Sequence, residues 1–152
     1  MSPEAGSRPE ICNCLALRQA ARHVTQFYDQ FLRPTGLRAS QFSILVQLRR
    51  DGPMTINALA AALLLDRTTL GRNLLPLQRA GLIAVRRGKT DRRSREVSLT
   101  SDGVERKRAG IKRWAAAQRE FEARFGGKRS AELRGLMHAV TASDLRVSAA
   151  PS

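Results

Sequence analysis

Long apolar runs are absent from this sequence, and so is an apolar segment near its N-terminus. No stretch approaches the roughly 20 apolar residues that a membrane-spanning helix needs. The first ten residues, MSPEAGSRPE, lack the apolar core of a secretory signal. We therefore expect a cytoplasmic protein that has no membrane partner.

Cysteine and histidine are also scarce. The chain has two cysteines, Cys12 and Cys14, and two histidines, His23 and His138. So few cysteines make no disulfide framework, and on a helix positions i and i+2 would point apart. The histidines do not stand at zinc-site spacing from the thiols. Paired carboxylates, a nucleophile–base set and a phosphate-binding loop are missing too, so we expect no metal, no cofactor and no enzyme.

Acidic residues are outnumbered by basic ones. The 152 residues include 27 Lys and Arg against 13 Asp and Glu, which gives a formal net charge of +14. Nucleic acid is the commonest polyanion that selects such an excess. The charge alone would suit a non-specific architectural DNA-binding protein, so that function stays open as an alternative.

The spacing of apolar residues predicts a mainly helical chain with one β-hairpin. We expect helices over residues 10–34, 40–50, 56–65, 67–81, 102–125 and 130–147, and strands over 82–87 and 95–100. Ser40, Thr55 and Asp66 are each placed to cap the helix that follows. Leu70, Leu74, Leu75 and Leu77 form the expected buried stripe of the helix over 67–81. Two short helices followed by a hairpin are typical of a winged helix-turn-helix.

The predicted fold class is therefore mainly α with a small β-hairpin wing, flanked by N- and C-terminal dimerisation helices. We expect a disordered tail over 1–9, a dimerisation helix over 10–34, the DNA-binding domain over 35–104, further dimerisation helices over 105–147 and a tail over 148–152. The apolar stripe of the first helix is too wide for a lone amphipathic helix, and a second copy of the chain would cover it.

Base-reading side chains follow Asp66 at the start of the helix over 67–81. The second helix of a helix-turn-helix presents its first residues to the DNA major groove. Arg bonds guanine, Asn bonds adenine, and the Thr methyl packs on thymine. The helix N-terminus also suits a phosphate. The expected base-reading set is Arg67, Thr68, Thr69, Arg72 and Asn73.

Cations crowd the tip of the hairpin. They suit DNA phosphates or a narrow minor groove. Asp91 stands among them, and two interpretations stay open: it pairs with a neighbouring arginine, or it forms a turn with its own backbone. The expected wing contacts are Arg86, Arg87, Lys89, Asp91, Arg92, Arg93 and Arg95.

Three stretches of this sequence resemble the MarR family of bacterial transcriptional regulators: LDRTTLGRNLLPLQRAGLI, the DRRS of the hairpin, and the LT-x-x-G that follows it. The resemblance runs from about Leu15 to at least Arg113. It implies a homodimer joined by the first and last helices, which binds a pseudo-palindromic double-stranded DNA operator and usually represses. The wing motif of the family implies that Asp91 is its Asp and that Arg93 enters the minor groove.

The resemblance also implies a signal that releases the DNA, and a small anionic or aromatic effector is one candidate. It would bind in a pocket between the dimerisation helices and the winged domain. Arg18, Arg22, His23 and Arg38 would meet its carboxylate there.

Oxidation of a cysteine is the other candidate signal. Cys14 stands where the peroxide-sensing branch of the family has its reactive cysteine, with Cys12 beside it. Tyr28 corresponds to a tyrosine that contacts the thiol in that branch. Arg18 and Ala39 stand where the same branch has further tyrosines, so this chain departs from the pattern at two positions.

Overall fold

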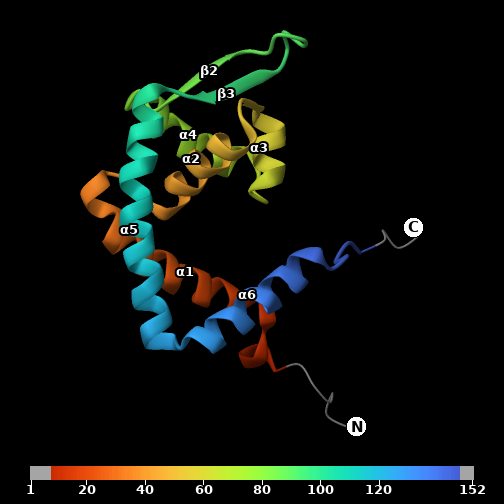
Figure 1. Cartoon of the computed structure of the whole chain (residues 1–152). Helices are drawn as coiled ribbons and strands as arrows, with labels where there is room; N and C mark the ends of the chain where they lie inside the picture. The colour runs from red at the N-terminus through yellow and green to blue at the C-terminus, as the bar shows by residue number, and fades with distance from the viewer. Residues whose placement is uncertain (1–7, 148–152) are drawn as a thin grey trace, which may run out of the picture. The chain divides into compact units, whose positions relative to one another are not determined.

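A computed structural model describes residues 8–147 as a mainly helical chain with one small sheet (Figure 1). Contacts divide the chain into two compact units, one up to Ala115 and the other from Ala116 on. The helices are α1 (Asn13–Leu32), α2 (Ala39–Asp51), α3 (Ile56–Ala62), α4 (Arg67–Arg79), α5 (Ser101–Phe125) and α6 (Gly127–Ala142). Two 3-10 turns, η1 (Pro9–Ile11) and η2 (Arg33–Thr35), flank α1. The tails expected over 1–9 and 148–152 lie outside the described residues, except for Arg8 and for Pro9, which begins η1.

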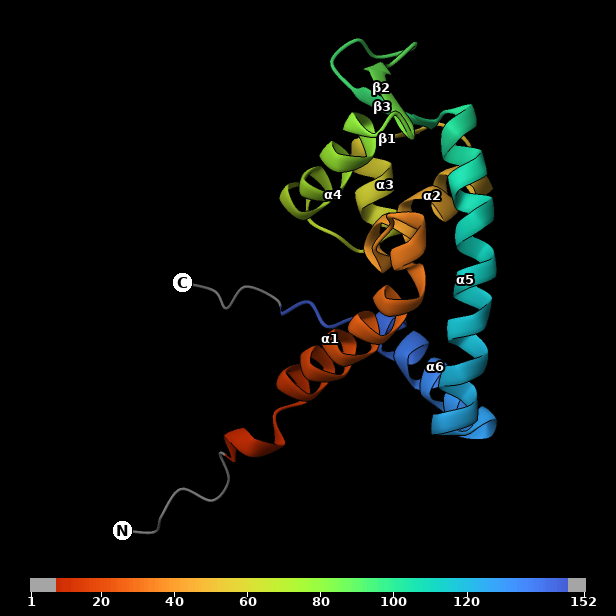
Figure 2. The ribbon, with the colours of Figure 1, turned by 90° about the vertical axis from the view of Figure 1, so that its left-hand side faces the viewer.

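The first unit contains the expected wing. Strand β2 (Ile83–Arg87) pairs antiparallel with β3 (Arg95–Leu99), with Val85 opposite Val97. A two-residue strand β1 (Met54–Thr55), too short to be recognised in the sequence, joins the other edge of β3. Figure 2 shows that the loop connecting β2 to β3 projects beyond helices α2–α4. The winged helix-turn-helix prediction is confirmed.

A leucine-rich core joins α2, α3 and α4 to the sheet. Leu70, Leu74 and Leu77 of α4 are buried as expected, but Leu75 is 47% exposed and that part of the prediction was wrong. Leu75 follows Leu74 by one position, about 100° around the helix, so its side chain leaves the core face. The buried cluster also includes Leu32, Leu37, Phe42, Ile44, Leu45, Leu48, Leu59, Ala60, Leu82, Ile83 and Val97.

Two of the three expected helix caps are present. The Thr55 hydroxyl accepts from the Ala58 N–H at 3.1 Å, and Asp66 accepts from the Thr69 N–H at 2.8 Å. The Ser40 prediction was wrong because α2 already begins at Ala39. The Arg38 N–H donates to Gln41 Oε1 at 3.0 Å, and the Ala39 N–H donates to Asp29 Oδ1 of α1 at 2.6 Å, so a residue ten positions earlier satisfies the first N–H of the helix.

Helix α1 is shorter than the predicted span of residues 10–34. It begins at Asn13, because Cys12 has extended backbone and its Sγ accepts from the Leu15 N–H at 3.4 Å, as a helix cap does. It ends at Leu32, where the Thr35 hydroxyl donates to the Leu32 carbonyl and Gly36 has a φ of +73°. The last helix, α6, likewise ends at Ala142 rather than at residue 147.

Thr100 joins the base of the wing to the start of α5. Its hydroxyl donates to the Gly81 carbonyl at 2.6 Å and accepts from the Gly103 N–H at 3.0 Å. A Cβ on Gly103 would lie 2.0 Å from the Leu82 carbonyl oxygen, so only glycine allows this approach. These contacts explain the LT-x-x-G motif in physical terms.

The second unit contains the end of α5 and all of α6. Ala117 and Ser130 are its buried residues. The rings of Phe121 and Phe125 stack with centroids 5.4 Å apart, and the Arg129 guanidinium lies 4.3 Å from the Phe125 centroid. Within residues 8–147, each helix is too short or too polar to cross a membrane.

We predict that Gly103→Ala lowers the free energy of unfolding by about 2 kcal/mol or more, because the added methyl forces Leu82 and α5 apart. Urea unfolding measures the change. Gly135→Ala in α6 is the matched control, since a Cβ there meets nothing within 4 Å. Equally small effects of the two substitutions would contradict the proposed close contact.

Candidate nucleic-acid interface

The start of α4 is held by the carboxylate of Asp66. Its Oδ1 accepts from the Thr69 N–H at 2.8 Å and its Oδ2 accepts from the Thr69 hydroxyl at 2.6 Å. The hydrogen bond from the Thr69 hydroxyl, and to a smaller extent the one from the Thr69 N–H, lower the pKa of Asp66 below its ordinary value. An ionised carboxylate therefore lies at the N-terminus of α4, where its negative charge would repel the phosphate that the sequence suggested.

The first two turns of α4 present three side chains to solvent. Arg67, Thr68 and Arg72 are exposed. Thr69 and Asn73 are half-buried, and each makes side-chain hydrogen bonds within the chain. The Asn73 amide donates to the Thr69 carbonyl at 3.0 Å, and its oxygen accepts from the Ser40 hydroxyl at 2.9 Å.

Ser40 is thus part of this surface, although the sequence argument placed it elsewhere. Its hydroxyl bonds Asn73 from the first turn of α2, which fixes the direction of the Asn73 amide. A serine 33 residues away carries no local signal of such a partner. Only the packing of α2 against α4 brings the two side chains together.

The tip of the wing is closed by hydrogen bonds around Asp91. Its carboxylate accepts from the Arg93 N–H at 2.9 Å, and its carbonyl accepts from the Ser94 hydroxyl at 2.7 Å. Gly88 donates to the Ser94 carbonyl at 3.0 Å, and a Cβ on Gly88 would lie 2.3 Å from Ser94 Oγ. Among residues 8–147 no ion pair involves Asp91, so the turn-forming interpretation is the one that the structure favours.

The wing cations are exposed and poorly balanced. Arg87 lies directly opposite Arg95, whereas Arg86 lies opposite Glu96. Like charges directly opposite each other on a sheet repel, so the Arg87–Arg95 pair destabilises the free hairpin and favours a bound anion. The exposed cations are Arg86, Arg87, Lys89, Arg92, Arg93 and Arg95.

Comparison with known proteins matches this geometry to a family. The model of the MarR family matches residues 37–94. A DNA-bound crystal structure of the Mycobacterium tuberculosis transcriptional regulator MosR is 35% identical, with a TM-score of 0.73 over 88% of this chain and 99% of that one. The chain belongs to the MarR family.

Two curated relatives of this MarR-family chain come from Bacillus subtilis. The organic hydroperoxide resistance transcriptional regulator is 31% identical over 91 residues, 60% of this chain, and the uncharacterised HTH-type regulator YwoH is 34% identical over 86 residues, 57% of this chain. The matches span 62% of the length of each relative. A mutant of Escherichia coli MarR complexed with operator DNA, at 21% identity and a TM-score of 0.76 over 87% of this chain and 95% of that one, shares the fold.

The four basic residues expected in an effector pocket are not brought together within one MarR-family chain. Arg18, Arg22 and His23 are exposed on α1. Arg38 lines a separate hollow with Arg33 and Asp29. A different cavity, of about 630 Å³, lies among α1, α2, α3 and α5. Its lining, which sequence spacing did not reveal, is Tyr28, Leu32, Ala39, Phe42, Ser43, Val46, Gln47, Leu63, Lys107, Ile111 and Trp114.

Both cysteines are free and exposed. The two cysteines do not share a helix, contrary to the sequence prediction, because Cys12 precedes α1 and only Cys14 lies in it. Tyr28 follows Cys14 by fourteen residues on the same helix, about 21 Å along its axis. Tyr28 therefore does not contact the Cys14 thiol within one chain.

We predict that Asp66→Asn removes one step from the acid unfolding profile. The lowered pKa means that ionised Asp66 stabilises the fold fully above an ordinary Asp pKa of about 3.9, and that this stabilisation disappears as the pH falls through the lower native value. Asn caps helices well but does not titrate. The difference between the urea midpoints of the two proteins, followed from neutral to acid pH, isolates Asp66. A difference independent of pH would contradict this role.

Proposed function

We propose that this chain is a transcriptional regulator that binds a pseudo-palindromic DNA operator as a homodimer and represses. One observation carries the proposal: within a single compact unit, the exposed start of α4 and the exposed cationic wing form the two reading elements of a winged helix. The relative MosR was crystallised with DNA, which supports the same use here.

The two elements have different tasks in this proposal. Arg67, Thr68 and Arg72 read base edges in the major groove, because their donors and methyl groups face solvent. Asn73 and Thr69 position that helix through their internal hydrogen bonds, and Asn73 keeps one amide N–H for a base. The wing contacts phosphates, and Arg93 reaches a minor groove whose negative potential attracts arginine.

Apolar side chains left exposed in both units support dimerisation. Leu15 in α1 is 48% exposed and Leu136 in α6 is 64% exposed. Apolar faces of helices are normally covered, and a second copy would cover both. Sedimentation of the free protein at micromolar concentration should give a mass of two chains, and a single-chain mass would refute the dimer.

We predict that two arginine substitutions affect operator binding in different ways. Arg93→Ala should weaken binding and reduce the slope of log K against log salt by about one unit, since one phosphate or minor-groove contact is lost. Arg72→Ala should also relax base preference, because a bidentate base contact discriminates by about 1–3 kcal/mol. Fluorescence anisotropy with the upstream region of the gene and its single-base variants measures both effects.

Arg108→Ala is the matched control for these substitutions, because Arg108 is an exposed arginine of α5 that already pairs with Glu105 at 3.1 Å. It should leave base preference unchanged. If random competitor DNA abolishes binding of the natural protein, the chain is a non-specific architectural binder. If both test variants keep full affinity, the winged-helix interface is refuted.

A small aromatic acid is the effector that the structure favours. The cavity of about 630 Å³ is lined mostly by aromatic and aliphatic side chains, with the uncharged polar Ser43 and Gln47 and one cation, Lys107. An aromatic ring fits such a lining, and Lys107 pairs with a carboxylate. The cavity touches α1, α2 and α5, so an occupant would alter the spacing of the two α4 helices in a dimer.

We predict that benzoate-type ligands quench the fluorescence of Trp114, the one tryptophan in the sequence. Lys107→Gln should weaken this binding about tenfold, the effect of losing a charge-assisted hydrogen bond. Lys112→Gln, on the same helix and outside this cavity, is the control. Saturable quenching that both substitutions leave unchanged would exclude Lys107 as the carboxylate partner.

Oxidation of Cys14 is the second candidate signal, favoured by its exposure in the first turn of α1. One relative is named as an organic hydroperoxide resistance regulator, and this name supports oxidation as the signal. We predict that peroxide releases the natural protein from its operator and that reductant restores binding. Cys14→Ser should stay bound, while Cys12→Ser, which keeps an oxygen acceptor for the Leu15 N–H, separates the roles of the two thiols. Release of Cys14→Ser by peroxide would end this hypothesis.

A further inference from the structure

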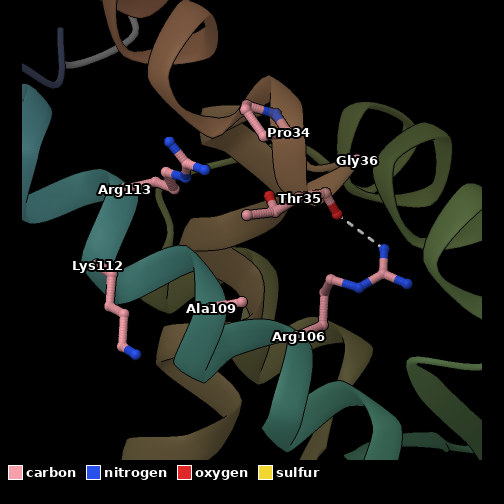
Figure 3. A pocket seen from close by; sticks show the side chains of 7 residues that line it. All are labelled: Pro34, Thr35, Gly36, Arg106, Ala109, Lys112 and Arg113. Atoms are coloured by element: carbon pink, nitrogen blue, oxygen red, sulfur yellow. Dashed lines mark hydrogen bonds between the residues drawn. The ribbon is translucent and has the colours of Figure 1, made fainter.

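A second cavity, of about 720 Å³, lies between the η2 turn and the first half of α5. It is distinct from the aromatic cavity, and the two share no lining residue. Three of its lining residues are cations and none is acidic. The lining is Pro34, Thr35, Gly36, Arg106, Ala109, Lys112 and Arg113 (Figure 3).

Arg106 is held in place by the turn opposite. Its Nη1 donates to the Thr35 carbonyl at 2.9 Å, and a Cβ on Gly36 would come within 3.3 Å of the same nitrogen. A guanidinium has five N–H donors, so this single bond leaves a second donor edge for a ligand. Because the Arg106 side chain is half-buried and already anchored, it would lose little rotamer entropy when a ligand binds to it.

Arg113 stands two turns further along the same face of α5. The separation of seven positions corresponds to about 10 Å along the axis, with the small side chain of Ala109 in between. Figure 3 shows Arg113 reaching toward Pro34 and Arg106 toward Thr35, while Lys112 extends away at the rim. The cavity thus offers two guanidinium groups at separate levels and a third cation at its edge.

Within residues 8–147, no ion pair joins an acidic side chain to Arg106, Lys112 or Arg113. Glu105 pairs with Arg108 at 3.1 Å, and Asp29 accepts the Ala39 N–H at 2.6 Å. Asp102 and Glu105 line a neighbouring hollow that Arg106 also borders, rather than this cavity. Uncompensated charge of one sign focuses an attractive potential for anions inside a hollow.

We propose that this cavity binds a small anion carrying two or more phosphate groups. Guanidinium forks match phosphate oxygens bidentately, and two forks carried by positions about 10 Å apart along the axis of α5 suit a linear chain of phosphates better than a single phosphate. The lining has no aromatic side chain to hold an aromatic acid, in contrast to the cavity beside Trp114. The site lies on the helix that leads from the wing, and it is independent of the operator-reading residues.

Inorganic tripolyphosphate is the probe, titrated by calorimetry into the full-length protein at constant ionic strength. The natural protein should bind it saturably, and its Tm should rise with ligand concentration. Arg113→Gln should weaken binding about tenfold, since a hydrogen-bonded ion contact is lost. Arg106 is left unchanged in this test because it also holds Thr35.

Arg108→Gln is the control, because it removes the same charge from the same helix outside this cavity. It should change tripolyphosphate binding by less than about twofold, and both variants should keep the unliganded Tm and the operator affinity of the natural protein. Equal weakening by both substitutions would reduce the effect to the net charge and overturn the site. Absence of saturable tripolyphosphate binding would also overturn the site. So would an Arg113→Gln variant that loses operator affinity as strongly as it loses tripolyphosphate affinity, because Arg113 would then be a DNA contact.

Discussion

The winged helix depends on one joint, where Thr100 bonds Gly81 on one side and Gly103 on the other. Gly81 ends the segment that follows α4, β3 enters the joint from the wing, and α5 leaves it. Because Gly103 lies against the Leu82 carbonyl, the three elements meet without space for a side chain. The Thr100 side chain and the close approach of Gly103 therefore fix the end of α4, the base of the wing and the start of α5 relative to one another.

The charged side chains of this fold lie apart from its apolar core. The core is made mostly of leucine and other aliphatic residues, whereas the cations lie on the surface: on the wing, on the solvent side of α4 and along α5, where Arg108 pairs with Glu105. The free protein carries the repulsion of Arg87 against Arg95, which a bound polyanion relieves. Two hollows with contrasting linings, one aromatic with a single lysine and one cationic without aromatics, suit two different classes of anion.

The sequence predicts what local chemistry decides. Thr55 and Asp66 cap the helices that follow them, because a cap needs only a side-chain oxygen three positions before an N–H. Alternation reveals β2 and β3, but β1 has two residues and no pattern. Ser40 and Asp29 were missed because each bonds a partner on another helix. The cavities were missed for the same reason: Tyr28 and Trp114 come together only when α1 packs near α5.

The acidic cap of α4 has a consequence for how this helix meets DNA. A helix N-terminus with free N–H groups attracts every phosphate alike, whatever the bases beside it. Asp66 places a negative charge of its own at that position, so the N-terminal N–H groups of α4 offer phosphates little attraction. The interaction of α4 with DNA therefore depends more on its exposed side chains than on the dipole of the helix that carries them.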